Sequence, residues 1–378
     1  FHKTRVLGAK KEQILGKSKK KWKVVNKTTR KIWAINTALK MLMCRGDMLF
    51  YETIDEATYM SMKAGLTKLS FGRVKGEEIA ILSETQSRSL NVNLAELALL
   101  RMGARPFHVV VPTPRQEAPV LIRSSGASNS VQQLGPVVKA LAASGMVVDL
   151  TVDGMLHAPE LPAIIKDGAR FFMISDEHPE ALERLLPDTE LMPRIKEAVK
   201  FTRSSKTMHV TSEAGSDLTI NMEKSPTVGI WGYCDRPGTV AHWPGGLIVS
   251  FPLKNTVNGT LVMDRGDVNL TFKRYLDSPI TMTLENDFIT KIDGSGTDAN
   301  MFRRYMEAWG DKNAYGTSHV GWGMNEAARY EAMTFFDKRD FNGTEIRAYA
   351  GNFLYSTGAN EFANRFTLGH FDLPIGNC

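Results

Sequence analysis

The chain has 378 residues, of which 43% are hydrophobic and 23% charged, so it can bury a full core and is long enough for two domains. No stretch approaches the roughly 18 consecutive apolar residues of a membrane helix. The first residues also lack the apolar segment of a signal peptide, so we expect a cytoplasmic protein. Cys44, Cys234 and Cys378 are too few and too scattered for a disulfide framework or a Cys-x-x-Cys zinc site.

The net charge of +6 comes from one end of the chain. Residues 1–31 hold twelve Lys or Arg and the single acid Glu12, whereas the rest of the chain holds 35 bases and 40 acids. Such an arm can contact phosphate backbones, but it lacks aromatic stacking repeats and a recognition-helix motif. We expect residues 1–60 to be a solvated basic extension outside the catalytic fold. Nucleic-acid binding is the alternative that we disfavour.

From residue 61 onward, apolar strands alternate with amphipathic helices. The pattern predicts strands at 78–83, 107–112, 146–152 and 170–174, and helices at 92–102, 128–143, 161–167, 179–186 and 190–204. Strands and helices that alternate at this spacing imply parallel pairing through right-handed crossovers. We predict an N-terminal α/β domain with a parallel sheet over residues 61–206.

After about residue 206 the sequence changes to short alternating segments separated by Gly, Pro, Asn and Asp. Strands are predicted at 208–212, 217–221, 259–263, 280–285 and 347–355, with helices at 298–309 and 325–336. Residues 207–378 are therefore predicted to form a C-terminal, strand-rich α+β domain. The fold class of the whole chain is α/β.

Two histidines and one aspartate near the C-terminus are candidates for one metal site. His319 lies in a glycine-rich segment, and His370 and Asp372 are two residues apart. If this pair lies on a strand, alternation puts both side chains on one face, as a 2-His-1-carboxylate iron site requires. A chain with eight histidines often contains such a pair by chance, so the spacing alone leaves a packed or hydrogen-bonded role open.

Motifs for nucleotide chemistry and serine hydrolysis are missing from the sequence. Gly294-Ser-Gly296 and Gly321-Trp-Gly323 lack the third glycine of a dinucleotide fingerprint, and neither a phosphate-binding Gly-x-x-x-x-Gly-Lys loop nor a Gly-x-Ser-x-Gly elbow occurs. The second domain instead combines glycines with Trp, Phe and single polar groups. That mix suits a pocket for a flat aromatic molecule.

Several segments of the chain resemble one known family. They are Leu156-His157, His242-Trp-Pro-Gly-Gly246, Ser318-His-Val-Gly-Trp-Gly323, Gly351-Asn-Phe-Leu-Tyr-Ser-Thr-Gly358 and His370-Phe-Asp-Leu-Pro374 with Asn377-Cys378. In this order they are similar to the 2,5-dihydroxypyridine 5,6-dioxygenase family, the ring-opening enzymes of bacterial nicotinate and nicotine breakdown. The resemblance runs from about residue 75 to the C-terminus and is strongest from residue 207 onward.

This resemblance implies a two-domain scaffold like that of the M29 thermophilic aminopeptidases, with one non-haem Fe(II) per subunit. It carries the metal ligands over to His319, His370 and Asp372. It further implies 2,5-dihydroxypyridine and dioxygen as substrates, N-formylmaleamate as the product, and a homo-oligomer.

The resemblance also marks the substrate pocket, whose matching residues are Leu156, His157, His242 and Ser356. His157 or His242 is the expected general acid or base, because histidine titrates near neutral pH. Leu156 and Ser356 are the expected substrate contacts. From the residues alone, a structural hydrogen bond is the alternative role for both histidines.

Three positions depart from the related enzymes. Leu247 stands where the aminopeptidases have a metal-binding Glu after the Gly-Gly pair, and His319 stands where they have another. Losing these carboxylates leaves a mononuclear site richer in imidazole, which suits Fe(II) better than a zinc pair. Ile230 stands where a pocket glutamate is expected in the dioxygenases. The alternative function is a mononuclear metal hydrolase that cleaves an amide, peptide or lactone on the same scaffold.

Overall fold

The computed structural model describes residues 74–115, 126–234, 236–338 and 341–376, all within one compact unit, Thr58–Cys378. The predicted basic extension, residues 1–60, lies outside the described residues, as do Asn377 and Cys378. Within the described ranges, no helix is both long enough and apolar enough to cross a bilayer.

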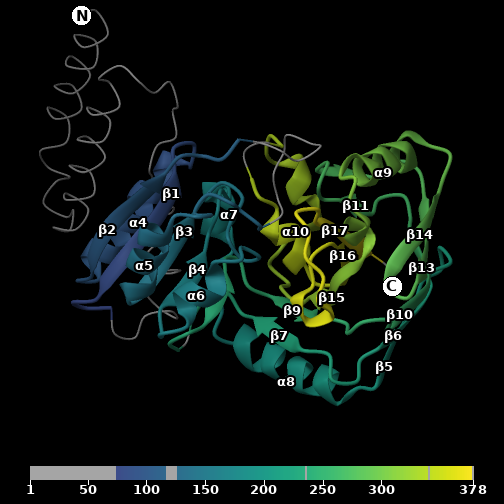
Figure 1. Cartoon of the computed structure of the whole chain (residues 1–378), viewed down its shortest axis with the longest axis horizontal. Helices are drawn as coiled ribbons and strands as arrows, with labels where there is room; N and C mark the ends of the chain where they lie inside the picture. The colour runs from purple at the N-terminus through teal and green to yellow at the C-terminus, as the bar shows by residue number, and fades with distance from the viewer. Residues whose placement is uncertain (1–73, 116–125, 235, 339–340, 377–378) are drawn as a thin grey trace, which may run out of the picture. The chain divides into compact units, whose positions relative to one another are not determined.

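The first sheet is parallel, with strand order β2-β1-β3-β4-β8 (Figure 1). Its strands are β1 (Glu78–Glu84), β2 (Arg105–Val111), β3 (Met146–Leu150), β4 (Arg170–Met173) and β8 (Val240–His242). Because β3 and β4 are buried along their whole length, they are mostly apolar in the sequence, with Asp149 and Arg170 as the exceptions. The predicted α/β class with a parallel sheet is confirmed. Since β8 follows residue 206 in the chain, the predicted domain boundary there stays a prediction.

Five α-helices occur among the described residues of this first part of the chain. They are α4 (Ser89–Arg101), α5 (Gly135–Ala143), α6 (Leu161–Ile165), α7 (Pro179–Arg184) and α8 (Leu191–Ser204). Helix α8 buries Leu191, Ile195 and Val199, which are four residues apart and so lie on one face. A Cβ on Gly229 would lie 2.3 Å from Cγ2 of Ile195, so only glycine lets the helix pack this closely on the strand below it.

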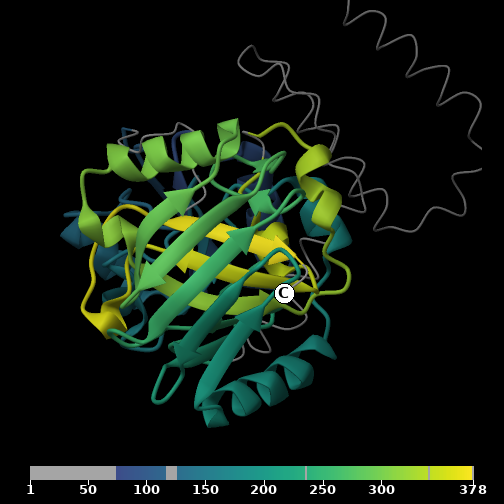
Figure 2. The same cartoon turned by 90° about the vertical axis from the view of Figure 1, so that its right-hand side faces the viewer.

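Two antiparallel sheets form the second part of the chain (Figure 2). One has the order β14-β13-β10-β6-β5, with β5 (Thr207–Thr211), β6 (Asp217–Asn221), β10 (Val257–Met263), β13 (Ile280–Glu285) and β14 (Phe288–Asp293). The other has the order β17-β16-β15-β9-β7, with β7 (Thr227–Ile230), β9 (Leu247–Ser250), β15 (Thr317–Gly323), β16 (Asn352–Thr357) and β17 (Phe371–Gly376). A short hairpin joins β11 (Val268–Asn269) to β12 (Arg274–Tyr275).

The two antiparallel sheets share one hydrophobic core. Val320, Tyr355 and Phe371 enter it from the second sheet, and Leu261 enters it from the first. Helix α9 (Thr297–Ala308) closes the core with Phe302, whose ring centroid lies 4.7 Å from that of Phe371. Because strand side chains alternate, this core leaves the other face of the second sheet to different residues.

Two predicted elements of the C-terminal part are wrong. The helix predicted at 325–336 is only the 3-10 turn η3 (Tyr330–Thr334), and α10 (Thr344–Ala348) occupies the start of the strand predicted at 347–355. Asn325 explains the first error, because its backbone N–H bonds the Ala348 carbonyl and its side chain bonds the Gly245 carbonyl. These tertiary bonds fix Asn325 in place, and its carbonyl accepts the Ala328 N–H in a tight turn rather than an α-helical one. Two other 3-10 turns are η2 (Lys312–Tyr315) and η4 (Glu361–Ala363).

A buried ion pair anchors the connection from β16 to β17. Nη2 of Arg365 lies 3.2 Å from Oδ2 of Asp287, and the two side chains are 4% and 2% exposed. The Asp287 carboxylate also accepts backbone N–H groups of the 255–257 segment, while Nη1 of Arg365 donates to the Thr317 carbonyl. The pair therefore ties the segment that leads to His370 onto the β13–β14 turn.

Replacing Arg365 should destabilise the protein markedly. Arg365→Met leaves the Asp287 carboxylate buried without its cation, so we expect the free energy of unfolding, measured by urea denaturation, to fall by about 3 kcal/mol. Arg194→Met is the matched control, because the Arg194–Glu326 pair is largely exposed and its loss should cost less than about 1 kcal/mol. Equal losses in the two variants would contradict the anchoring role.

Candidate metal centre

Three polar side chains lie in one row across the second antiparallel sheet. His319 on β15 is in register with Ser356 on β16, and Ser356 is in register with Asp372 on β17. Cross-strand partners point to the same face of a sheet, so all three side chains lie opposite the shared hydrophobic core. The core on the other face therefore fixes which residues this row presents.

His370 joins this row from just outside the strand. Strand β17 begins at Phe371, so the predicted strand position holds for Asp372 but not for His370. The predicted convergence is nevertheless present, because Nε2 of His370 lies 3.2 Å from Oδ1 of Asp372 and Nε2 of His319 lies 3.8 Å from the same oxygen. The structure thus brings the three sequence-predicted metal ligands together around one carboxylate oxygen.

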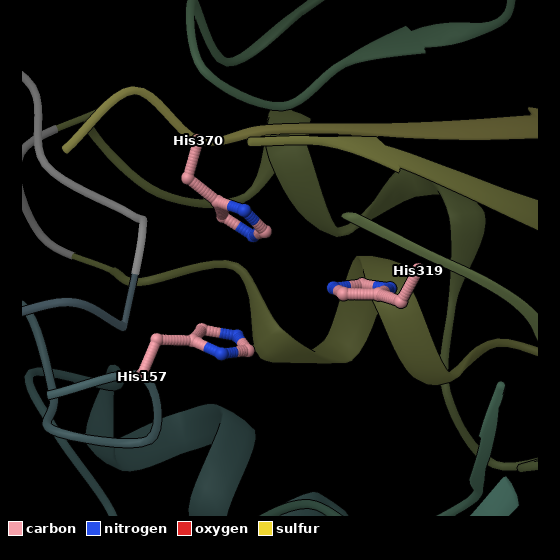
Figure 3. A group of neighbouring side chains, drawn as sticks. All are labelled: His157, His319 and His370. Atoms are coloured by element: carbon pink, nitrogen blue, oxygen red, sulfur yellow. The ribbon is translucent and has the colours of Figure 1, made fainter. Parts of the chain in front are cut away.

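A third imidazole comes from the parallel part of the chain. His157 follows β3, and its ring centroid lies 5.9 Å from that of His319 and 5.0 Å from that of His370. One ring nitrogen from each of the three histidines lies within 4.8 Å of the other two (Figure 3). His157, which the sequence predicted only for the substrate pocket, is therefore also within reach of a metal ion.

Burial sets the protonation states of these groups. It lowers the pKa of His319 to about 3 and, together with the charges of His370 and His319, lowers the pKa of His157 well below its usual value. Burial would raise the pKa of Asp372, but Arg347 and the two neighbouring imidazoles hold it well below its usual range. At neutral pH His319 and His157 are therefore neutral and Asp372 is ionised, the forms that bind a metal.

The residues present fit one transition-metal ion. Within the described part of the chain, Nδ1 of His319 is buried and has no hydrogen-bond partner, which a coordinated or hydrated metal site would explain. Imidazole nitrogen and a single carboxylate oxygen form the donor set that non-haem iron uses. His319, His370 and Asp372 could hold such an ion, with His157 facing it as a fourth group.

The other predicted pocket residues have different surroundings. Ser356 is fully buried, and its hydroxyl donates to Oδ1 of Asp372, so it supports the carboxylate directly. His242 on β8 is 2% exposed and bonds the Pro244 carbonyl through Nδ1 at 2.8 Å. Leu156 is half-buried next to His157. The structure thus brings His157 and Ser356 to the candidate ligands and gives His242 a backbone partner.

An apolar cluster adjoins the imidazoles. The Phe251 ring meets His319 edge to face, with ring centroids 5.9 Å apart, and packs against Ile230 and Leu247. Ile230 and Leu247 are cross-strand partners on β7 and β9, so the two positions where related enzymes were expected to have carboxylates adjoin in one apolar cluster. Neither position can supply an anionic ligand for a second metal ion.

Sequence reasoning missed two residues of this site. One is Arg347 on α10, whose Nε donates to Oδ2 of Asp372 at 2.5 Å. The other is Phe251, whose ring packs against the imidazole of His319. A single arginine on a five-residue helix carries no motif, and it lies 25 residues from Asp372 in the sequence. Only the position of α10 relative to the second antiparallel sheet shows that Arg347 reaches Asp372.

Comparison with known proteins agrees with this geometry. The family model described as 2,5-dihydroxypyridine 5,6-dioxygenase matches residues 62–378. The curated 2,5-dihydroxypyridine 5,6-dioxygenase of Pseudomonas putida KT2440 is 35% identical over 306 residues, which cover 80% of this chain and 86% of that protein.

Solved structures give the same answer for the fold. The 2,5-dihydroxypyridine dioxygenase of Pseudomonas putida KT2440 matches with a TM-score of 0.78 and 34% identity, covering 84% of this chain and 91% of that one. The aminopeptidase AmpT of Thermus thermophilus matches with a TM-score of 0.55 and 14% identity, covering 84% of this chain and 92% of its own, a likeness of fold alone. The expected aminopeptidase-like scaffold and the family resemblance are confirmed: this chain belongs to the 2,5-dihydroxypyridine 5,6-dioxygenase family.

Proposed function

We propose that the chain opens the ring of 2,5-dihydroxypyridine with dioxygen to give N-formylmaleamate, using one Fe(II) held by His319, His370 and Asp372. The observation that carries this proposal is the single carboxylate oxygen shared by two imidazoles, 3.2 and 3.8 Å away, in a member of this family. Bound Fe(II) would supply the electron transfer between the ring and triplet dioxygen that a closed-shell aromatic otherwise lacks. Three protein ligands on one side of the ion leave adjacent positions for both substrates.

The charge of the site suits a deprotonated hydroxypyridine. An imidazole binds a metal ion in its neutral form, so two imidazoles and one carboxylate place a single negative charge around the divalent ion. The guanidinium of Arg347 lies against that carboxylate. A ring oxygen that carries negative charge is therefore attracted rather than repelled. A second carboxylate at Ile230 or Leu247 would weaken this attraction.

His157 is the group best placed to move a proton. Its ring lies within 6 Å of both His319 and His370, and burial keeps it neutral, so one of its nitrogens can accept the proton of a ring hydroxyl. General base help of this kind contributes on the order of 10²–10⁴ in rate. Phe251 packs against His319, and Leu156 is the half-buried neighbour of His157, so both add apolar surface that suits the face of a flat ring.

Alanine substitution should distinguish the proposed metal ligands from His157, the proposed general acid or base. One proposed iron ligand is lost in each of the variants His319→Ala, His370→Ala and Asp372→Ala. We therefore expect both the iron content after anaerobic loading and the oxygen uptake to fall to near zero. His157→Ala should keep the iron and lower kcat by on the order of 10²-fold. His209→Ala is the control, because His209 is exposed and paired with Asp217. Full activity in a ligand variant, or lost iron in His157→Ala, would contradict these assignments.

The reaction class is tested by oxygen stoichiometry. Enzyme loaded anaerobically with Fe(II) should consume one dioxygen per 2,5-dihydroxypyridine and bleach the ultraviolet absorbance of the ring. Turnover of other hydroxylated pyridines and benzenes then shows how strongly the apolar cluster around Ile230 restricts substrate specificity. Turnover of an amide or lactone without oxygen would instead establish the hydrolase alternative.

Acid should destabilise the fold partly through His242. Burial lowers the pKa of His242 to about 4, below the value of about 6.5 in an unfolded chain, so the unfolded state binds the extra proton between these values. The contribution is fully present above pH 6.5 and is lost as the pH falls towards 4. Between pH 7 and pH 5, the free energy of unfolding measured by urea denaturation should fall by about 2 kcal/mol more in the wild type than in His242→Gln. An equal loss in both would refute this.

A further inference from the structure

The candidate carboxylate ligand is held by two donors from its own part of the chain. Nε of Arg347 donates to Oδ2 of Asp372 at 2.5 Å, and the two side chains are 11% and 4% exposed. The Ser356 hydroxyl donates to the other oxygen, Oδ1, which also faces His370 and His319. Arg347 thus holds Oδ2, while Oδ1 is the oxygen that Asp372 turns towards the two imidazoles.

The guanidinium also reaches away from the carboxylate. Nη1 of Arg347 donates to Oδ1 of Asn342 at 3.4 Å, and Nδ2 of Asn342 donates to Oγ of Ser175 at 3.0 Å. Asn342 and Ser175 are 3% and 1% exposed, so both bonds are shielded from water. Ser175 lies two residues after the end of β4 in the parallel sheet, whereas Asp372 lies on the second antiparallel sheet.

Ser175 continues the chain of bonds to the segment that carries His157. Its hydroxyl lies 3.2 Å from the carbonyl of Thr151 and 3.3 Å from that of Val152. The buried carboxylate of Asp149 accepts the backbone N–H of Thr151 and of Met155, so the segment is fixed from β3 to within two residues of His157. One hydrogen-bonded path therefore joins the His157 segment to the Asp372 carboxylate.

We propose that Arg347, Asn342 and Ser175 form a positioning relay that sets the Asp372 carboxylate and the His157 segment in one fixed geometry. The inference rests on the proposed function, since it assigns Asp372 to the metal and His157 to the substrate. The two groups are 215 positions apart in the chain, with Asp372 on β17 and His157 in the segment after β3, so local structure cannot fix their separation. Hydrogen bonds that orient metal ligands typically account for 10–100-fold in metal affinity, and a misplacement of about 1 Å can cost 10²-fold in rate.

Arginine suits the central place in this relay. Its planar guanidinium directs Nε to Asp372 and Nη1 to Asn342 at a fixed angle, while lysine supplies one charged nitrogen without that fork. Arg347→Lys should therefore restore the attraction to the carboxylate without restoring the bond to Asn342. Asn342→Leu and Ser175→Ala break the relay without touching Asp372.

The first test is Co(II) affinity, measured by chelator competition without turnover. Arg347→Met should weaken binding about 10–100-fold and change the visible Co(II) spectrum, with partial recovery in Arg347→Lys. Asn342→Leu and Ser175→Ala should stay within about threefold of the wild type, because Asp372 keeps its direct partners. Arg203→Met is the control, since Arg203 is an exposed arginine whose described bonds go only to the Thr227 carbonyl. It should leave affinity and spectrum unchanged.

The second test is steady-state turnover of the Fe(II) enzyme. Asn342→Leu and Ser175→Ala should each lower kcat about tenfold with little change in KM, and the double variant should be no slower than the worse single one. Additive losses in the double variant, or wild-type Co(II) affinity in Arg347→Met, would overturn the relay. If the wild type binds Co(II) but its Fe(II) form consumes no dioxygen, the proposed function fails while the Co(II) results still decide the role of Arg347.

Discussion

The burial of one ionised carboxylate among imidazoles constrains the rest of this structure. An uncompensated buried charge costs several kcal/mol, so Asp372 can stay ionised only where donors surround it. Arg347 and Ser356 supply those donors from α10 and β16, and His370 approaches from the residue before β17. Strand register, helix placement and loop anchoring must therefore all be correct before the site exists.

Strand register is enforced from the opposite face of the same sheet. Moving β15, β16 or β17 by one residue would turn Val320, Tyr355 or Phe371 out of the shared core. The same slip would bury His319, Ser356 or Asp372 in apolar surroundings. The cost of exposing the core side chains, about 1.5–3 kcal/mol each, thus protects the polar row as well. The strand register that buries the apolar residues on one face of the sheet therefore also positions the polar residues on the other face.

Sequence reasoning recovered the parts of the molecule that are coded locally. Alternation of apolar segments predicted the parallel sheet, and the spacing of His370 and Asp372 predicted their convergence. The helix expected at 325–336 failed because Asn325 bonds distant backbone groups instead of a helical turn. The approach of His157 and the place of Arg347 depend on contacts between sheets, which no local pattern records.

The apolar cluster is consistent with the single metal ion that we propose for this site. A second divalent cation beside the first would need anionic ligands of its own, because neutral imidazoles cannot offset two double charges at short range. Leu247, where the sequence resemblance leads us to expect such a ligand in aminopeptidases, is 3% exposed and belongs to the same apolar cluster as Ile230. A carboxylate at either position would have to displace close-packed side chains and lose its hydration. Leu247 and Ile230 therefore give the candidate site an apolar wall of the kind that an aromatic ring needs.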